Sequence, residues 1–129
     1  MKLLLDTHAF LWMAGEWKRV RPAARRVLQD ASTELYLSVA SIWEISIKTA
    51  LGRLMLPAAP PVYVPRRIAD FGVRVVDVTR DHALAVFSLP AHHADPFDRM
   101  IVAQAQLEQL TVATNDRIFR KYSVQVLPV

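Results

Sequence analysis

Short apolar runs of strand length alternate with helix-forming segments along this sequence. Strands are expected at residues 2–5, 35–39, 73–78, 111–114 and 124–127. Apolar spacing and the positions of glycine and proline predict helices at residues 10–15, 22–31, 41–51, 66–71, 79–89 and 96–110. Strands that alternate with helices usually form a parallel sheet with helices on both faces. The sequence therefore predicts an α/β fold.

The length of 129 residues suits one domain, residues 1–129, with its own core. The one proline-rich stretch, residues 56–65, is too short to separate two domains and is interpreted as an internal connection. The hydrophobic fraction of 53% argues against disorder. The absence of cysteine excludes disulfides and thiolate metal sites.

No segment of the sequence is typical of a membrane span or a signal peptide. The longest stretch without Asp, Glu, Lys or Arg, residues 82–94, has 13 residues and contains three histidines and a proline. Asp6 and His8 interrupt the first apolar run before a signal-peptide core is complete. We therefore expect a cytoplasmic protein that does not interact with membranes.

Basic residues exceed acidic ones, 16 to 12, which favours an anionic partner. Five of the 16 fall within nine positions: Lys18, Arg19, Arg21, Arg25 and Arg26. Such a run is either a solvated helix face or a surface that contacts phosphates, and the sequence does not decide between the two.

Acidic residues stand where two of the expected strands end. Asp6 closes the first strand, and Asp116 follows the strand at 111–114. In open parallel sheets, ligands bind beyond the carboxyl ends of the strands, so both side chains are candidates for a site. Each is equally well placed to cap a following helix, and for either residue alone capping is the stronger interpretation.

Glu44 lies in a helix that is apolar on nearly every side. A carboxylate buried there without a partner would be costly or would hold its proton at neutral pH. Lys48, one turn further on, is the structural alternative as its ion-pair partner. A role for Glu44 in a polar site is slightly favoured over that pair.

The segment His92-His93-Ala94-Asp95-Pro96-Phe97-Asp98-Arg99 carries the strongest local signal. Its pattern predicts a helix start with Asp95 as N-cap and Pro96 in the first position. Asp98, in the first turn, can point out of the helix end into a shared cleft. A metal site built on the histidines is disfavoured, because adjacent side chains usually point in different directions.

Taken together, four motifs resemble the PIN-domain family and specifically the VapC-type toxins of bacterial toxin–antitoxin pairs. The first is Leu3-Leu4-Leu5-Asp6-Thr7-His8, and the second is Ser38-Val39-Ala40-Ser41-Ile42-Trp43-Glu44-Ile45. The third runs on from His92 through Asp95-Pro96-Phe97-Asp98 to Ala105, and the fourth is Thr114-Asn115-Asp116 with Phe119. They follow in the family's order from the first strand to the last helix.

The resemblance implies a three-layer α/β/α sandwich around a mainly parallel sheet of four to five strands. It implies a divalent metal, Mg²⁺ or Mn²⁺, and endonucleolytic cleavage of structured RNA to 5′-phosphate and 3′-hydroxyl ends. It also implies a VapB-type antitoxin as partner and a homodimer.

The residues that match the family's acidic quartet are Asp6, Glu44, Asp98 and Asp116. We expect Asp6, Glu44 and Asp98 to hold the principal metal and Asp116 to complete the site. Asp95 is either a further ligand or only a helix cap. The expected supporting residues are Thr7, Ser41, Thr114 and Asn115. The expected RNA-binding residues are Arg25, Arg26, Lys48 and Arg117. More broadly, backbone phosphates are expected to contact the basic run at residues 18–26 together with Arg66, Arg67, Arg117, Arg120 and Lys121.

Carboxylates gathered in one cleft repel each other, and a divalent cation with oxygen ligands relieves that repulsion. A phospho-acceptor domain or an Asp-x-Asp phosphatase is disfavoured, because the first strand ends in a single Asp followed by Thr-His. A module that only sequesters an antitoxin remains as the alternative without catalysis.

Overall fold

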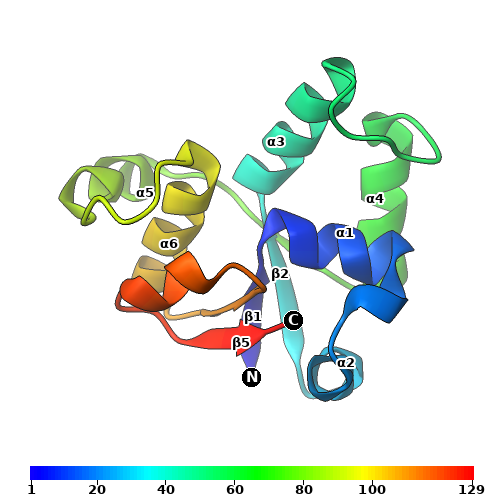
Figure 1. Cartoon of the computed structure of the whole chain (residues 1–129), viewed down its shortest axis with the longest axis horizontal. Helices are drawn as coiled ribbons and strands as arrows, with labels where there is room; N and C mark the ends of the chain where they lie inside the picture. Colours follow the sequence, from blue (N-terminus) through cyan, green and yellow to red (C-terminus); the bar gives the residue numbers. More distant parts are fainter.

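A parallel sheet of five strands forms the centre of the molecule in the computed structural model, which describes residues 1–129 (Figure 1). The strands are β1 Lys2–Leu5, β2 Glu34–Ser38, β3 Arg74–Val76, β4 Thr111–Thr114 and β5 Val126–Pro128. Their order across the sheet is β3-β2-β1-β4-β5, and each neighbouring pair is parallel. The predicted α/β fold with a parallel sheet is confirmed.

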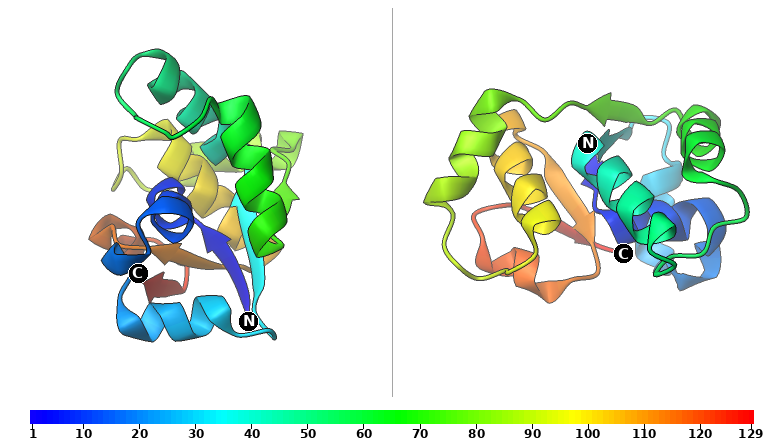
Figure 2. Two further views of the ribbon diagram at one scale, coloured as in Figure 1. Left: turned by 90° about the vertical axis from the view of Figure 1, so that its right-hand side faces the viewer. Right: turned by 90° about the horizontal axis from the view of Figure 1, so that it is seen from above.

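Helices cover both faces of this sheet, as expected for a three-layer sandwich (Figures 1 and 2). The α-helices are α1 Thr7–Gly15, α2 Pro22–Gln29, α3 Val39–Ala50, α4 Pro60–Phe71, α5 Arg80–Ala85 and α6 Pro96–Glu108. Three short 3-10 helices complete the elements: η1 Trp17–Arg19, η2 Val86–Ser88 and η3 Arg117–Lys121.

The alternation of side chains along β1 divides the core into two parts. Leu3 and Leu5 point to one face and pack with α1 to α4, where Phe10 and Ile45 are fully buried. Leu4 points to the other face and packs with α6 and η3. All three leucines are fully buried, so β1 is covered on both faces, as its continuous apolar run predicts.

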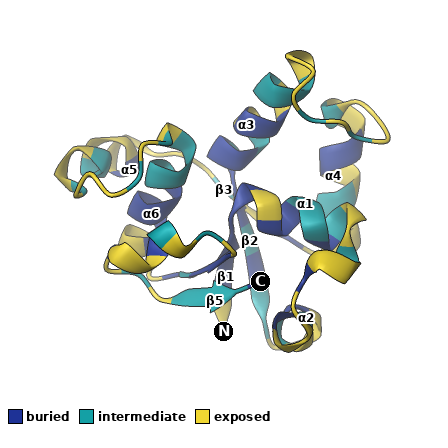
Figure 3. Cartoon of the chain, viewed as in Figure 1, coloured by how far each residue is buried: buried dark blue, intermediate teal, exposed yellow.

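Burial is deepest at the centre of the sheet and on the helix surfaces that face it (Figure 3). Strand β1 hydrogen-bonds to β2 on one side and to β4 on the other. The ends of these three strands therefore lie side by side at the same edge of the sheet, and the segments that follow them begin there.

Helix α4 differs from the prediction, which begins it at residue 66 and interprets the preceding prolines as a connection. The helix begins at Pro60, and Pro60 and Pro61 occupy its first two positions. Proline is accepted there because the first amides of a helix have no partner within the helix. Pro65 lies inside the helix, and this proline is what misled the prediction.

Smaller differences concern the ends of elements. The predicted helix at 79–89 is α5 followed by η2, and β3 and β5 are shorter than predicted, with β5 beginning two residues later. Strands β1 and β4 have the predicted bounds. No helix in the structure has the length and apolar character needed to cross a membrane.

Candidate active site

Asp6 connects β1 to α1 and is buried at the edge of the sheet. Its Oδ1 accepts a hydrogen bond from the Ala9 amide at 2.8 Å, so it caps α1 as its position suggests. Its Oδ2 accepts one from the hydroxyl of Thr114, the last residue of β4. Burial raises the pKa of the Asp6 carboxyl, and the bonds from Thr114 and Ala9 oppose that rise. Asp6 is therefore both a cap and a member of a polar cluster.

Glu44 projects from α3 and is only 3% exposed. Its Oε1 accepts a hydrogen bond from the Thr7 hydroxyl at 2.6 Å, and its Oε2 pairs with Lys48. The hydrogen bond to Glu44 raises the pKa of Lys48. The ion pair with Lys48 and a place in a polar site are therefore both found for Glu44. It pairs with Lys48, and it is near enough to Asp98 for its charge to act on that carboxyl.

Asp98 stands in the first turn of α6, behind Asp95. Asp95 caps this helix by accepting hydrogen bonds from the amides of Phe97 at 2.8 Å and Asp98 at 3.1 Å. Burial raises the pKa of Asp98 to about 7, and the negative charges of Asp95 and Asp6 contribute to the rise. The Asp98 carboxyl is therefore close to its midpoint of ionisation at neutral pH.

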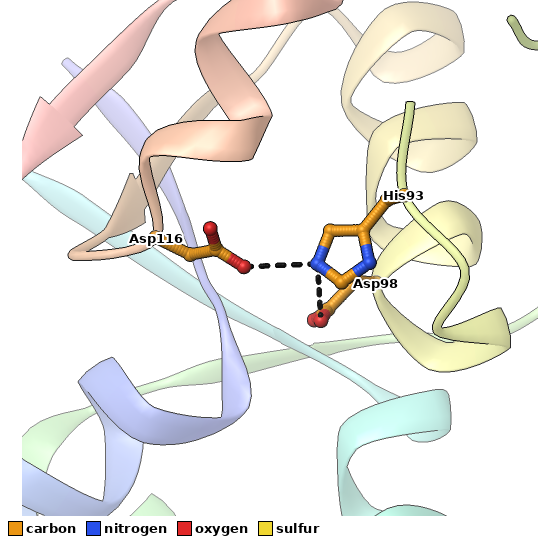
Figure 4. Close-up of side chains that lie close together, drawn as sticks. All are labelled: His93, Asp98 and Asp116. Carbon is orange, nitrogen blue, oxygen red and sulfur yellow. Dashed lines mark hydrogen bonds and ion pairs between the residues drawn. The ribbon is translucent and has the colours of Figure 1, made fainter. Parts of the chain in front are cut away.

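His93 lies between two of the acidic residues (Figure 4). Its Nε2 is 3.1 Å from Asp98 Oδ2 and 2.9 Å from Asp116 Oδ2. These three side chains are the one group of histidine and acidic residues in the structure that could hold a metal ion together. Their potential metal-ligating atoms all lie within 4.8 Å of one another. The second histidine, His92, packs its ring against Tyr122 instead.

The position of His93 was not predicted from the sequence. The two histidines point in different directions, as expected, but neither was expected among the carboxylates. The signal that identifies it is local, because His93 Nδ1 accepts the Asp95 amide at 3.1 Å and is thereby fixed next to the cap of α6. With its lone pair on Nδ1, the ring carries its hydrogen on Nε2 and donates it to Asp116 Oδ2, while Asp98 Oδ2 lies at ion-pair distance.

Asp116 follows β4 and caps η3 with its Oδ1, which accepts the Ile118 amide at 2.9 Å. Its own amide donates to Thr114 Oγ1 at 2.9 Å. Thr114 therefore joins Asp6 and Asp116. The structure thus brings Asp6, Glu44, Asp98 and Asp116 into one region, and the tightest part of it consists of Asp98, Asp116 and His93.

The expected supporting residues behave in different ways. Thr7 and Thr114 donate to Glu44 and Asp6, as expected. Ser41 is fully buried one turn before Glu44 on the same face of α3, and its hydroxyl has no hydrogen-bond partner. The Asn115 side chain is exposed next to Asp116 and makes no hydrogen bond.

The expected RNA-binding residues do not form one surface. Arg25 and Arg26 belong to α2, which lies near the end of the sheet where β1 begins (Figures 1 and 2), and neither of them lines a pocket with Asp116, as Arg21 before this helix does. The Arg25 guanidinium is engaged within the protein, with the Lys18 carbonyl oxygen at 2.9 Å. Lys48 is paired with Glu44, while Arg117 is exposed directly after Asp116. RNA binding by these four residues stays a prediction.

The residues of this site fit a divalent cation. Asp6, Glu44 and Asp98 supply carboxylate oxygens, the ligands that Mg²⁺ and Mn²⁺ prefer. Burial raises the pKa of Asp98, and the charges of Asp95 and Asp6 add to the rise, so a cation bound there would favour the ionised carboxylate. The unpartnered Ser41 hydroxyl adds a polar group that a water in such a site could satisfy.

Comparison with known proteins agrees with this fold. Residues 3–125 match the PIN domain model. The chain therefore belongs to the PIN-domain family. It is 31% identical over 121 residues to the ribonuclease VapC22 of Mycobacterium tuberculosis, across 93% of this chain and 91% of that protein. A second relative from that organism, the ribonuclease VapC16, is 41% identical over 59 residues, 46% of this chain and 40% of that protein.

Solved structures share the fold at low sequence identity. VapBC2 from Rickettsia felis, bound to a DNA fragment from its promoter, is similar with a TM-score of 0.74 at 12% identity, across 98% of both chains. DNA-bound VapBC from Salmonella typhimurium gives a TM-score of 0.69 at 18% identity, across 98% of this chain and 97% of that one. The predicted PIN-like fold is confirmed.

Proposed function

We propose that this chain, acting as a single domain in the cytoplasm, is an endoribonuclease toxin. It hydrolyses phosphodiester bonds in structured RNA with the help of Mg²⁺ or Mn²⁺, and a VapB-type antitoxin inhibits it. The observation that carries the proposal is the gathering of Asp6, Glu44, Asp98 and Asp116 at one edge of the sheet. The full-length relative at 31% identity, which is a ribonuclease, supports the choice of RNA as substrate.

Asp6, Glu44 and Asp98 would hold the metal, directly or through water, and Asp116 would complete the site. A divalent cation held there would supply an activated water and would offset negative charge on the phosphate. Thr7 and Thr114 fix the orientation of Glu44 and Asp6 through their hydroxyl groups. Lys48 balances the charge of Glu44, and His93 donates from Nε2 to Asp116 and lies at ion-pair distance from Asp98.

A groove beside α1 is where we place the antitoxin. It has a volume of about 400 Å³ and is lined by six apolar residues together with His8, Glu16 and Arg19. Leu11 and Trp12 contribute from α1, and residues 54–57 form the opposite wall. Asp6 immediately precedes α1. A segment bound in this groove would therefore lie close to the acidic site, where it could block metal or RNA.

A second apolar hollow supports the homodimer. It has a volume of about 430 Å³, and eight of its nine lining residues are hydrophobic. Trp43, on α3, is 63% exposed and packs edge-on against Phe97 at this surface, with 5.4 Å between the ring centres. An exposed apolar surface of this kind is typical of a protein–protein contact.

Cleavage of a structured RNA by the purified chain tests the proposal. We expect fragments with 5′-phosphate and 3′-hydroxyl ends when Mg²⁺ or Mn²⁺ is present, and no fragments in EDTA. Asp98→Asn should abolish this cleavage. The matched control is Asp81→Asn, which removes an exposed carboxylate on α5 and should leave cleavage unchanged.

Two results would contradict the proposal. Equal cleavage by Asp98→Asn and the unaltered chain would remove Asp98 from the mechanism. No cleavage of any RNA by the folded, metal-loaded chain would favour a module that only binds an antitoxin.

A further inference from the structure

A small polar pocket lies next to the acidic site, on the side of β4 and β5. It has a volume of about 200 Å³. Arg21, at the start of α2, approaches it from one side, and Arg117 and Arg120 approach it from η3. The remaining lining residues are Thr114, Asn115, Asp116, Val126 and Pro128. Three guanidinium groups from two distant parts of the sequence therefore converge on one small space.

None of these three arginines has a partner within the protein. Their side chains make no hydrogen bond and no ion pair, unlike Arg19, Arg67 and Arg74, which pair with Glu16, Asp70 and Glu34. The one carboxylate in the pocket is that of Asp116, and its two oxygens already accept from Ile118 and His93. The pocket thus holds an excess of positive charge that nothing in the chain neutralises.

Phosphate is the ligand that suits this chemistry. A guanidinium group presents several N–H donors in a planar fork that matches the oxygens of a phosphate. Polar groups predominate in the lining, and Val126 is its one hydrophobic member, so an apolar ligand is disfavoured. Asn115 adds an exposed side-chain amide that can donate to the same oxygens.

We infer that the pocket of Arg21, Arg117 and Arg120 binds a backbone phosphate of the RNA, next to the one that is cleaved. The location carries this assignment, because Asp116 belongs both to the pocket and to the acidic cluster. An RNA strand with one phosphate at Asp98 can therefore continue past Asp116, and its next phosphate can enter the pocket. This inference rests on the proposed ribonuclease function and specifies how the substrate would be held.

The double variant Arg21→Ala with Arg120→Ala tests the inference. Both side chains are exposed and make no hydrogen bond or ion pair, so their loss should leave the fold unchanged. The matched control, Arg53→Ala with Arg80→Ala, removes two exposed arginines outside the pocket. The RNA affinity of each is measured by fluorescence anisotropy in an Asp98→Asn background, so that the oligonucleotide stays intact.

We expect the pocket variant to bind RNA about tenfold more weakly than the control, the loss of a charge-assisted contact. The slope of log affinity against log salt concentration should become shallower by about 0.7, the value for one phosphate contact in a single strand. In the cleaving enzyme, KM should rise while kcat stays nearly constant. Equal affinity and equal salt dependence in the two double variants would overturn the inference.

A second measurement separates this inference from the ribonuclease proposal. Inorganic phosphate is titrated into the metal-free chain without RNA, and the arginine Nε–Hε signals are followed by NMR. Shifts that disappear in the pocket variant support a phosphate site even where no RNA is cleaved, in which case only the ribonuclease proposal fails. Phosphate binding without any loss of RNA affinity in the variant would overturn the assignment to RNA.

Discussion

The two halves of the acidic site differ in how their charges are balanced. In the half at the end of β1 and on α3, Asp6 and Glu44 accept hydrogen bonds from Thr114 and Thr7, and Lys48 adds a positive charge. In the half on α6 and next to η3, Asp98 and Asp116 share the single Nε2 of His93. The pKa of Asp98 is raised to about 7, whereas Glu44 has a cation beside it.

This difference indicates which half depends more on a metal. In the half with Asp6 and Glu44, burial also raises the pKa of Asp6, but hydrogen bonds from Thr114 and Ala9 oppose that rise. For Asp98 the largest cause is again burial, the charges of Asp95 and Asp6 add to it, and His93 is the one group that opposes it. A bound cation should therefore have a clear stabilising effect at Asp98.

The largest expected effect follows from Asp98→Asn. This change removes a charged oxygen ligand and should weaken Mn²⁺ binding at least ~100-fold, more than the usual effect of residues that only support ligands. The free energy of unfolding of the metal-free chain should stay the same or rise, since a repelled buried carboxylate is lost. Isothermal titration calorimetry and urea denaturation measure the two quantities, and unchanged Mn²⁺ affinity would contradict the comparison.

Lys48→Met tests how much the half with Asp6 and Glu44 depends on the positive charge of Lys48. Glu44 is nearly fully buried and would lose its ion-pair partner, so we expect a loss of about 2 kcal/mol in the free energy of unfolding, limited by the partial exposure of Lys48. The double variant with Glu44→Gln should recover most of this loss. A double-mutant cycle in urea gives the coupling, and additive effects would show that the pair is not coupled.

His93→Ala should raise the pKa of Asp98 further in the metal-free chain. Charge attraction from His93 lowers the pKa of Asp98, so its removal should raise that pKa by about one pH unit, equivalent to about 1.4 kcal/mol. Carbon-13 NMR titration of the aspartate carboxyls measures it. His92→Ala is the matched control, because that ring packs on Tyr122 and should leave Asp98 unaffected.

The smallest expected effect is on thermal stability as a function of pH. The folded chain binds the Asp98 proton more tightly than the unfolded chain, because the folded pKa of about 7 exceeds the ordinary value of 3.8. Stability from this group is therefore present near pH 4 and is lost as pH rises towards 7. We expect the metal-free chain to melt about 3–5 °C lower at pH 8 than at pH 5.5, roughly 1 kcal/mol.

Two comparisons by calorimetry make this last prediction specific. Mn²⁺ should restore the melting temperature at pH 8 and have little effect at pH 5.5. Asp98→Asn should reduce the difference between the two pH values. A metal-free chain that is more stable at pH 8 would show that other groups dominate.

Much of the fold could be predicted because the local pattern and the tertiary structure agree. The apolar run of β1, the capping sequence at Asp95 and Pro96, and the position of Asp116 each specify their element within a few residues. Parallel strands then bring Asp6 and Asp116 to one edge without further information. Helix α4 could not be predicted in full, because three prolines outweighed its apolar spacing.

Contacts between side chains far apart in the sequence were harder to predict. His93 contacts Asp116, which is 23 positions further along the sequence. Hydrophobic periodicity predicts helices and strands, but it does not predict where a side chain on a loop will lie. Arg21 was part of a basic run that offered no way to single it out. Its convergence with Arg117 and Arg120 depends on the position of α2 relative to β5, which only the folded structure gives.

Thr114 has a consequence for the synthesis of this protein. Its hydroxyl holds Asp6 across 108 positions, and β4, which it ends, is a direct neighbour of the first strand. A nascent chain on the ribosome lacks Thr114 and Asp116 until β4 and the segment after it have been translated. While only the first three strands have been made, the acidic site is therefore incomplete and the Asp6 carboxylate has no hydroxyl group to hold it.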